Sequence, residues 1–325
     1  MNTKYYDVIV AGAGPAGICA AVAAARQGAR VALIERYGVI GGNLTAGYVG
    51  PILGSVSKNT IDCTGDAIVS FLAGAKIEKG RADGLMQPVT LEYTIDGVDE
   101  SKGIICIGDV DNVQLNGECF LDWCKKKADE GKLPRMLAAV RLHPSVRPGC
   151  RQVNTTQVNR VDITSVSSIF TADLELRQQI RLLTQFLKEN LPGYENCRVI
   201  GSGTTTGVRE SRRVMGDYVI DADEMAEGCR FADVVVHKAL FIVDIHNPDG
   251  AGQAEPTIQY CKPYDLPYRC FLPLGLEGLL VAGRCISCHE YLHGDGRGCW
   301  HCRCHECVAA LYSAGSRCRR VAETA

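Results

Sequence analysis

The sequence predicts an α/β fold: a parallel sheet that starts near residue 8, with a second, α+β part inserted later in the chain. Two apolar runs, residues 8–10 and 31–34, flank a glycine-rich turn and an Ala-rich segment that ends near Arg26. Strand, turn, helix and strand in this order form the first unit of a parallel sheet. Far downstream, residues 172–190 form a long amphipathic segment, which indicates that further structure interrupts this sheet domain.

The turn after the first apolar run has the spacing Gly12-x-Gly14-x-x-Gly17. Gly12 permits a tight strand-to-helix turn, Gly14 lets the backbone approach a pyrophosphate, and Gly17 permits close packing of helix and strand. Glu35 ends the second apolar run, where its carboxylate can accept hydrogen bonds from a ribose diol. The pattern therefore predicts a Rossmann-like domain that binds a dinucleotide.

Composition narrows the class of protein. The chain has 325 residues, of which 46% are hydrophobic and 22% charged, and its formal net charge is -2. We expect two structural units, no nucleic-acid partner and no membrane partner. No signal peptide is evident, because Asp7 precedes the first apolar run and the glycine turn interrupts it. With 17 cysteines and no such signal, we expect reduced thiols and a cytoplasmic location.

Several further motifs resemble one family. Arg36 follows Glu35, and then come Gly41, Gly42 and Asn43; the sequence Thr64-Gly65-Asp66 follows a later strand, and Gly283-Arg284 follows the last apolar run. Further motifs of the same family follow one another along the chain, at residues 79–90, 192–196, 207–213, 244–250 and 264–270. This arrangement resembles the FAD-dependent oxidoreductases of the glutathione-reductase-like superfamily. The resemblance implies a three-layer ββα domain that binds FAD or NAD(P), with FAD as the cofactor here.

The resemblance also implies which residues bind FAD and how the domains are arranged. The cofactor-binding residues would be Gly12, Gly14, Pro15, Ala16, Gly17, Glu35, Arg36, Gly41, Gly42, Asn43, Gly65, Asp66, Gly283 and Arg284. Residues 1–84 would form the first part of the FAD domain, residues 85–273 a substrate or cap domain, and residues 274–325 the returning part of the FAD domain. The expected helices in the insert are residues 172–190, which end before Pro192-Gly193, and residues 116–130. Residues 136–160 read as irregular, and residues 161–171 are β-branched.

The chain departs from the family pattern in two places. Family members carry a helical stretch and a β-meander between the Gly-Gly turn and the Thr-Gly-Asp turn, whereas here the short span from Tyr48 to Thr60 cannot hold a meander and a returning strand. Either the chain is a natural minimal variant or it carries an internal deletion. After Ser287 the family continues into an Ala/Gly-rich helix, but this chain has a Cys-rich tail.

Three origins of the tail remain open. Its Cys299, Cys302, Cys304 and Cys307, with two histidines, offer ligands for zinc, although their spacing is too crowded for a usual zinc knuckle. Alternatively, residues 293–308 are an out-of-frame reading of the expected helix, because a one-nucleotide shift restores small residues. A native tail of unknown role is the third. We predict no metal site.

Catalytic residues are sought inside the shared motifs, because flavin supplies the redox chemistry and the protein supplies position and protons. Arg209 can bind a substrate carboxylate, and His246 or His289 can relay a proton. Arg212 and Arg269 are further charged candidates, and for Arg212 or Arg213 a solvated position or a structural ion pair is an equal interpretation. The sequence thus predicts hydride transfer between a small organic substrate and flavin. A degraded relative that holds FAD weakly or not at all is the alternative.

Overall fold

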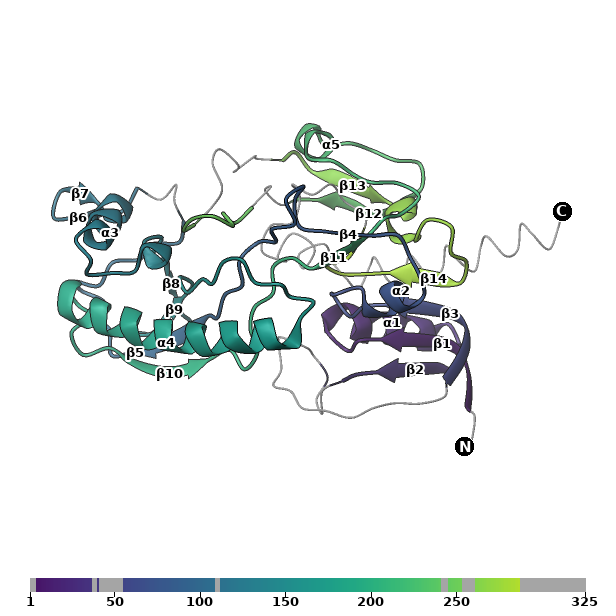
Figure 1. The fold of residues 1–325 in the computed structure, drawn as a ribbon, viewed down its shortest axis with the longest axis horizontal. Helices are drawn as coiled ribbons and strands as arrows, with labels where there is room; N and C mark the ends of the chain where they lie inside the picture. Colours follow the sequence, from purple (N-terminus) through teal and green to yellow (C-terminus); the bar gives the residue numbers. More distant parts are fainter. Residues whose placement is uncertain are drawn as a thin grey trace. The chain divides into compact units, whose positions relative to one another are not determined.

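The protein is described by a computed structural model that covers residues 4–36, 40, 55–108, 112–240, 245–252 and 261–286. Compactness divides the chain into two units. Unit 1 comprises Met1–Gly84, Glu210–Ile245 and Thr257–Ala325, and unit 2 comprises Leu85–Arg209 and His246–Pro256. Figure 1 shows both units in sequence colours.

Unit 1 is built on a four-stranded parallel sheet (Figure 1). Its strand order is β14 (Leu279–Val281), β3 (Ser55–Asp62), β1 (Lys4–Ala11) and β2 (Val31–Ile34). Helix α1 (Pro15–Arg26) connects β1 to β2 and packs on both strands. The Ala-rich sequence of α1 lets it approach the sheet closely, because its buried face offers only small side chains such as Ala20 and Ala24. This confirms the predicted α/β fold with a parallel sheet.

The last strand of this sheet comes from the far end of the described chain. In β14, Leu279 pairs with Thr60 and Val281 pairs with Asp62, both in β3. Strand β3 itself pairs along β1 from Lys4 to Ala11. The span from Tyr48 to Thr60, predicted to be too short for a meander and a returning strand, contains the first part of β3, which begins at Ser55.

The remainder of unit 1 consists of short elements. Two antiparallel pairs are formed by β4 (Ile77–Lys79) with β11 (Arg212–Val214), and by β12 (Val234–Ala239) with β13 (Tyr264–Pro267). The short helices are α2 (Ile68–Leu72), α5 (Ala222–Glu227) and the 3-10 turn η4 (Tyr268–Phe271). Helix α5 begins with a capping box, in which Asp221 and Glu224 satisfy each other's backbone N–H groups.

Unit 2 joins an antiparallel sheet to a long helix (Figure 1). The strand order is β10 (Arg198–Ser202), β5 (Tyr93–Asp96), β9 (Arg151–Val153) and β8 (Leu142–Pro144). Helix α4 (Val166–Asn190) contributes Leu176, Leu183 and Leu187 to one apolar core with residues of β5 and β9. The smaller elements are β6 (Gln114–Leu115), β7 (Glu118–Cys119), α3 (Phe120–Asp129) and η3 (Arg135–Leu137).

Both predicted helices exist, with different starting points. Helix α4 begins six residues earlier than expected, inside the β-branched stretch, because Ser165 caps it by accepting a hydrogen bond from the N–H of Ser168. Leu174, near the start of the predicted amphipathic segment, is 49% exposed. Helix α3 occupies only the second part of the predicted 116–130 segment. Residues 136–160, read as irregular, contain β8 and β9.

The division into units differs from the sequence-based boundaries at two segments. Residues 210–245 and 257–273 group with unit 1, although they fall inside the predicted insert. Strand pairing explains the first difference, because β11 lies in this segment and pairs with β4. Within the described part of the chain, no helix combines the length and the apolar character needed to cross a membrane.

Candidate functional site: the glycine loop and a buried polar cluster

The loop between β1 and α1 needs glycine at two of its three motif positions for steric reasons. Gly12 has a φ of +95°, and a Cβ there would lie 2.7 Å from the carbonyl oxygen of Cys63. A Cβ at Gly17 would lie 1.7 Å from the carbonyl oxygen of Gly12. Both positions therefore serve the tight turn and the close packing of helix and strand, as the motif predicts.

Gly14 differs from its two neighbours in the motif. A Cβ built on Gly14 would meet no atom within 4 Å, so the loop backbone borders open space at this point. Gly14 is also the N-cap of α1, where no side chain caps the helix and no acidic residue occupies the first turn. The positive end of the helix dipole and its first N–H groups are thus left for an anion.

Glu35 lies directly after β2 and reaches the glycine loop. Its Oε2 atom accepts a 2.5 Å hydrogen bond from the backbone N–H of Ala13. The carboxylate thus stands beside the loop, at the place where the motif requires a partner for the ribose. The open space at Gly14, the uncapped start of α1 and this carboxylate together fit the diphosphate and ribose of FAD.

Two turns at the carboxyl ends of neighbouring strands are tied together by an ion pair. Asp66 follows β3, Arg284 follows β14, and the Nη2 atom of Arg284 donates to Oδ1 of Asp66. Both side chains are largely buried, at 17% and 10% exposure. A Cβ at Gly65 would lie 3.3 Å from this guanidinium, whereas a Cβ at Gly283 would meet nothing within 4 Å. The Thr-Gly-Asp and Gly-Arg motifs therefore meet in one place.

The turn after β3 is built around a second buried carboxylate. Asp62 is fully buried and accepts hydrogen bonds from the backbone and hydroxyl groups of both Thr64 and Ser70. Nearby, burial raises the pKa of the Cys285 thiol well above its ordinary value. Cys285 is therefore protonated at neutral pH and is unsuited to act as a thiolate nucleophile.

Arg209 belongs to a buried polar cluster in unit 2. Only 4% of Arg209 is exposed, and its Nη2 atom donates to Oγ1 of Thr90 at 3.2 Å and to Oδ1 of Asn154 at 3.4 Å. The sequence motif points to Arg209, but nothing in the local sequence marks Thr90 or Asn154 as its neighbours. The two residues lie 119 and 55 positions away along the chain.

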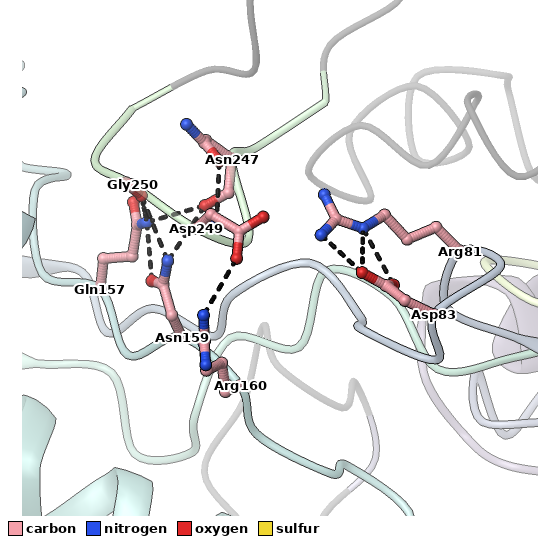
Figure 2. Close-up of polar contacts among 8 residues, drawn as sticks. All are labelled: Arg81, Asp83, Gln157, Asn159, Arg160, Asn247, Asp249 and Gly250. Carbon is pink, nitrogen blue, oxygen red and sulfur yellow. Dashed lines mark hydrogen bonds and ion pairs between the residues drawn. The ribbon is translucent and has the colours of Figure 1, made fainter.

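His246 is held in unit 2 by the turn that follows it. The residue is 2% exposed, and its backbone N–H donates to Oε1 of Gln87 at 3.0 Å. Two carboxamide side chains bind this turn, as Figure 2 shows. The Nε2 atom of Gln157 and the Nδ2 atom of Asn159 each donate hydrogen bonds to the carbonyl oxygens of Asn247 and Gly250. Sequence inspection does not reveal that Gln157 and Asn159 contact this turn.

Three other arginines have structural partners. Arg213 is buried and donates to Glu210 at 2.5 Å and to the Gly80 carbonyl at 2.8 Å. Arg269 pairs with Asp233 at 2.9 Å, and Arg212 donates to the carbonyl oxygen of Asp66 at 3.2 Å. For Arg212 and Arg213 these contacts favour a structural role, and the candidate Arg269 is held by an ion pair as well.

Several of the predicted site residues lie outside the described residues. They are Gly41, Gly42, Asn43, His289 and the residues of the Cys-rich tail. Pro15 and Ala16 start α1, and Arg36 is exposed beyond Glu35. Among the described residues, no group of three or more His, Cys, Asp or Glu side chains is arranged to hold a metal ion.

Short matches connect the chain to curated relatives. The soluble pyridine nucleotide transhydrogenase of Marinomonas sp. is 53% identical over 45 residues, and that of Enterobacter sp. is 58% identical over 46 residues. Each match covers 14% of this chain and 10% of the relative. The chain thus spans about a tenth of the length of the curated relatives that it matches.

Solved structures resemble the chain only loosely. A geranylgeranyl bacteriochlorophyll reductase-like protein from Thermoplasma acidophilum aligns with a TM-score of 0.42 and 13% identity, over 99% of this chain and 80% of that one. A flavin-dependent brominase aligns with a TM-score of 0.40 and 11% identity, over 94% and 78%.

The family comparison covers most of the sequence. The family model described as FAD dependent oxidoreductase matches residues 7–60 and 56–298. The two matched segments meet at residues 56–60, inside β3. The glycine loop, Glu35, the Asp66–Arg284 pair and the Arg209 cluster all lie within the match. The chain therefore belongs to the FAD dependent oxidoreductase family, an enzyme family whose cofactor is FAD.

Proposed function

We propose that the protein transfers a hydride between a small organic substrate and FAD. The observation that carries the proposal is the glycine loop, where open space at Gly14 adjoins an uncapped helix N-terminus and the carboxylate of Glu35. When bound, FAD supplies the group that accepts or gives the hydride. The chain's own residues would position the substrate and manage protons.

The residues of the loop have separate tasks in this proposal. The N–H groups at the start of α1 would bind the phosphate oxygens, and Gly14 would let them come close. Glu35 would bind the ribose with the carboxylate that Ala13 orients. Arg36, Gly41, Gly42 and Asn43 would continue the cofactor site, as would Gly65, Asp66, Gly283 and Arg284, where the ion pair fixes two turns.

Unit 2 would bind the substrate. Arg209 carries a permanent positive charge in a buried setting, which suits a substrate carboxylate. His246 would exchange a proton with the substrate, since an imidazole titrates near neutral pH. His289 is a second proton carrier in this proposal. Unit 1, which includes residues 1–84 and 274–325, would form the FAD domain, and unit 2 would form the substrate domain.

Absorbance and reduction test the proposal. Purified protein should be yellow, and anaerobic addition of its substrate should bleach the visible flavin bands. A panel of small carboxylic acids, each with its amide, would identify the class of substrate. Arg209→Lys should raise the KM for acids more than for amides, because a single ammonium cannot form the bidentate contact. His246→Gln should lower kcat and remove a limb of its pH profile.

A colourless protein that gains no thermal stability from added FAD would contradict the proposal and support a degraded relative instead. The open questions on the shortened span and the tail are tested on the coding DNA. An intact reading frame through residues 290–308 would exclude the frame-shift origin of the tail.

We also propose a cytoplasmic location. A chain with 17 cysteines that are expected to stay reduced suits a reducing compartment. Alkylation of the thiols in intact cells, followed by mass spectrometry, would test this location. Extensive disulfide formation in the isolated native protein would contradict it.

A further inference from the structure

Residues 154–157 form a run of four polar side chains that are all buried. Three of these side chains form hydrogen bonds with backbone groups of other segments of unit 2. The hydroxyl of Thr156 accepts from the N–H of Leu91 and donates to its carbonyl, both at 2.8 Å, and Thr155 accepts from the N–H of Arg141 at 2.9 Å. The side chain of Gln157 donates to the Gly250 carbonyl, and its backbone forms two hydrogen bonds with the side chain of Gln179. These three side chains thus have structural partners that account for their burial.

Asn154 is the exception in this run. It is 4% exposed, yet its Nδ2 atom has no hydrogen-bond partner. The orientation of the amide is fixed, because Oδ1 accepts from the guanidinium of Arg209 at 3.4 Å. Turning the amide would place its NH2 group against the cationic Nη2 atom. A buried amide donor without an acceptor keeps the cost of its lost hydration, so a functional reason for it is expected.

The surroundings define what would satisfy this donor. The missing partner must be an acceptor atom, since Nδ2 can only donate. The positive charge of Arg209 lies beside the amide, which favours an anionic acceptor over a neutral one. Thr90 lies on the same guanidinium, and because its Oγ1 accepts from Nη2 at 3.2 Å, its own proton points elsewhere. Cation, amide donor and hydroxyl donor together suit the two oxygens of a carboxylate.

We propose that Asn154, with Thr90 and Arg209, forms a carboxylate-binding site in unit 2, in which Asn154 Nδ2 donates to one carboxylate oxygen. The inference rests on the proposed function only in taking this carboxylate to be part of the substrate. Asn154 is then the residue that distinguishes an acid from compounds lacking an acceptor oxygen.

The experiment uses the full chain and acetate as the probe, with acetamide as the neutral comparison, at constant ionic strength. Acetate should raise the melting temperature in a saturable manner and shift the side-chain amide NMR signal of Asn154. Asn154→Asp should weaken acetate binding by at least about tenfold, because its carboxylate would pair with Arg209 and repel the anion. Asn154→Leu, of similar volume, should weaken it to a similar degree. Acetamide should bind more weakly than acetate to the unaltered chain.

Asn116→Asp is the matched control, since it adds the same charge at an exposed position of unit 2. It should leave acetate binding unchanged. Asn154→Asp should also fold as stably as the unaltered chain, which separates loss of binding from loss of structure.

Absence of saturable acetate binding, or acetate binding by both Asn154 variants that is as tight as in the unaltered chain, would overturn the proposal. The flavin absorbance is measured on the same samples. Yellow protein without acetate binding contradicts only this site, whereas colourless protein with Asn154-dependent acetate binding contradicts only the cofactor function.

Discussion

The carboxylate of Glu35 accepts a 2.5 Å hydrogen bond from the backbone N–H of Ala13, one residue before the N-cap of α1. The residue expected to bind ribose therefore also fixes the loop expected to bind phosphate. Replacement of Glu35 affects both parts of the nucleotide site at once.

Glu35→Ala should weaken FAD binding by about 1.5–3 kcal/mol, the usual value for hydrogen bonds to a charged group. Glu35→Gln can still accept from Ala13 and should lose less. Titration of the stripped protein with FAD, followed by flavin fluorescence, gives both dissociation constants. Equal affinity in all three proteins would mean that Glu35 has no contact with the nucleotide.

Gly14→Val and Gly17→Ala should fail for different reasons. At Gly14 the new side chain enters open space, so the apoprotein should fold normally and lose FAD. At Gly17 the new Cβ collides with the Gly12 carbonyl, which should destabilise the fold at the upper end of ~1–3 kcal/mol. Denaturant unfolding of the apoproteins and their flavin content separate the two effects.

The control for Gly14 is Gly201→Val in β10, where a Cβ also meets nothing within 4 Å. This variant should keep both its stability and its FAD. Stoichiometric flavin in Gly14→Val would falsify the assignment of this loop to the pyrophosphate.

The Asp66–Arg284 pair should show strong energetic coupling. Both side chains are mostly buried, so a double-mutant cycle with Asp66→Ala and Arg284→Ala should give a coupling of ~0.5–3 kcal/mol. The exposed Arg81–Asp83 pair, also drawn in Figure 2, is a natural comparison and should give at most ~1 kcal/mol. If both cycles gave the same small value, the ion pair would not fix the two turns.

Gln157→Leu should loosen the turn that carries His246. The variant removes two hydrogen bonds that Nε2 of Gln157 donates, one to the Gly250 carbonyl at 2.6 Å and one to the Asn247 carbonyl at 3.3 Å. A cost of about 1–3 kcal/mol is expected for leaving such buried groups underpaired. Hydrogen exchange at the amides of His246, Asn247 and Asp249 should accelerate. Gln114→Leu, at an exposed position, should leave these rates unchanged.

Alkaline pH should destabilise the fold through its buried thiols. Burial raises the pKa of Cys270 to about 12 and that of Cys197 to about 11, against an ordinary value of 9.0. The folded state therefore holds these protons longer than the unfolded state does. The stabilisation is present below pH 9 and is lost as the pH rises through the folded pKa values.

For Cys270 alone the loss should reach about 1.4 kcal/mol at pH 10, one unit above the unfolded pKa. Urea unfolding between pH 8 and pH 10 measures it. In Cys270→Ala the slope should be correspondingly flatter, whatever the stability of the variant at pH 8. An unaltered slope would show that another group governs the alkaline loss.

The first βαβ unit is predictable from sequence because its constraints are local. Glycine is needed at position 17 because of the Gly12 carbonyl, which lies in the same motif. Glycine is needed at position 12 because of the Cys63 carbonyl, which lies outside the motif. The start of α4 is less predictable: residues 166–171 include β-branched side chains, but the cap at Ser165 and packing of the helix on the sheet outweigh their preference.

The polar cluster is beyond local inspection for a different reason. Arg209 and His246 stand out as charged residues in shared motifs, whereas Asn154 lies in an ordinary polar run. Its character follows from burial and from one contact with Arg209, 55 residues away. Only the folded structure shows that one amide in that run, Asn154, has an NH2 group without a hydrogen-bond partner.

The position of β14 in the parallel sheet has a consequence during synthesis. Strand β3 ends at Asp62, but the strand that covers its outer edge starts at Leu279. At a ribosomal rate of ~5–20 residues per second, that edge waits on the order of 10–40 s for its partner. An uncovered edge strand pairs readily with other chains, so nascent molecules on one polysome are exposed to each other in this interval. Yield on expression should therefore depend on how fast translation proceeds between β3 and β14, and on chaperones that shield the waiting edge.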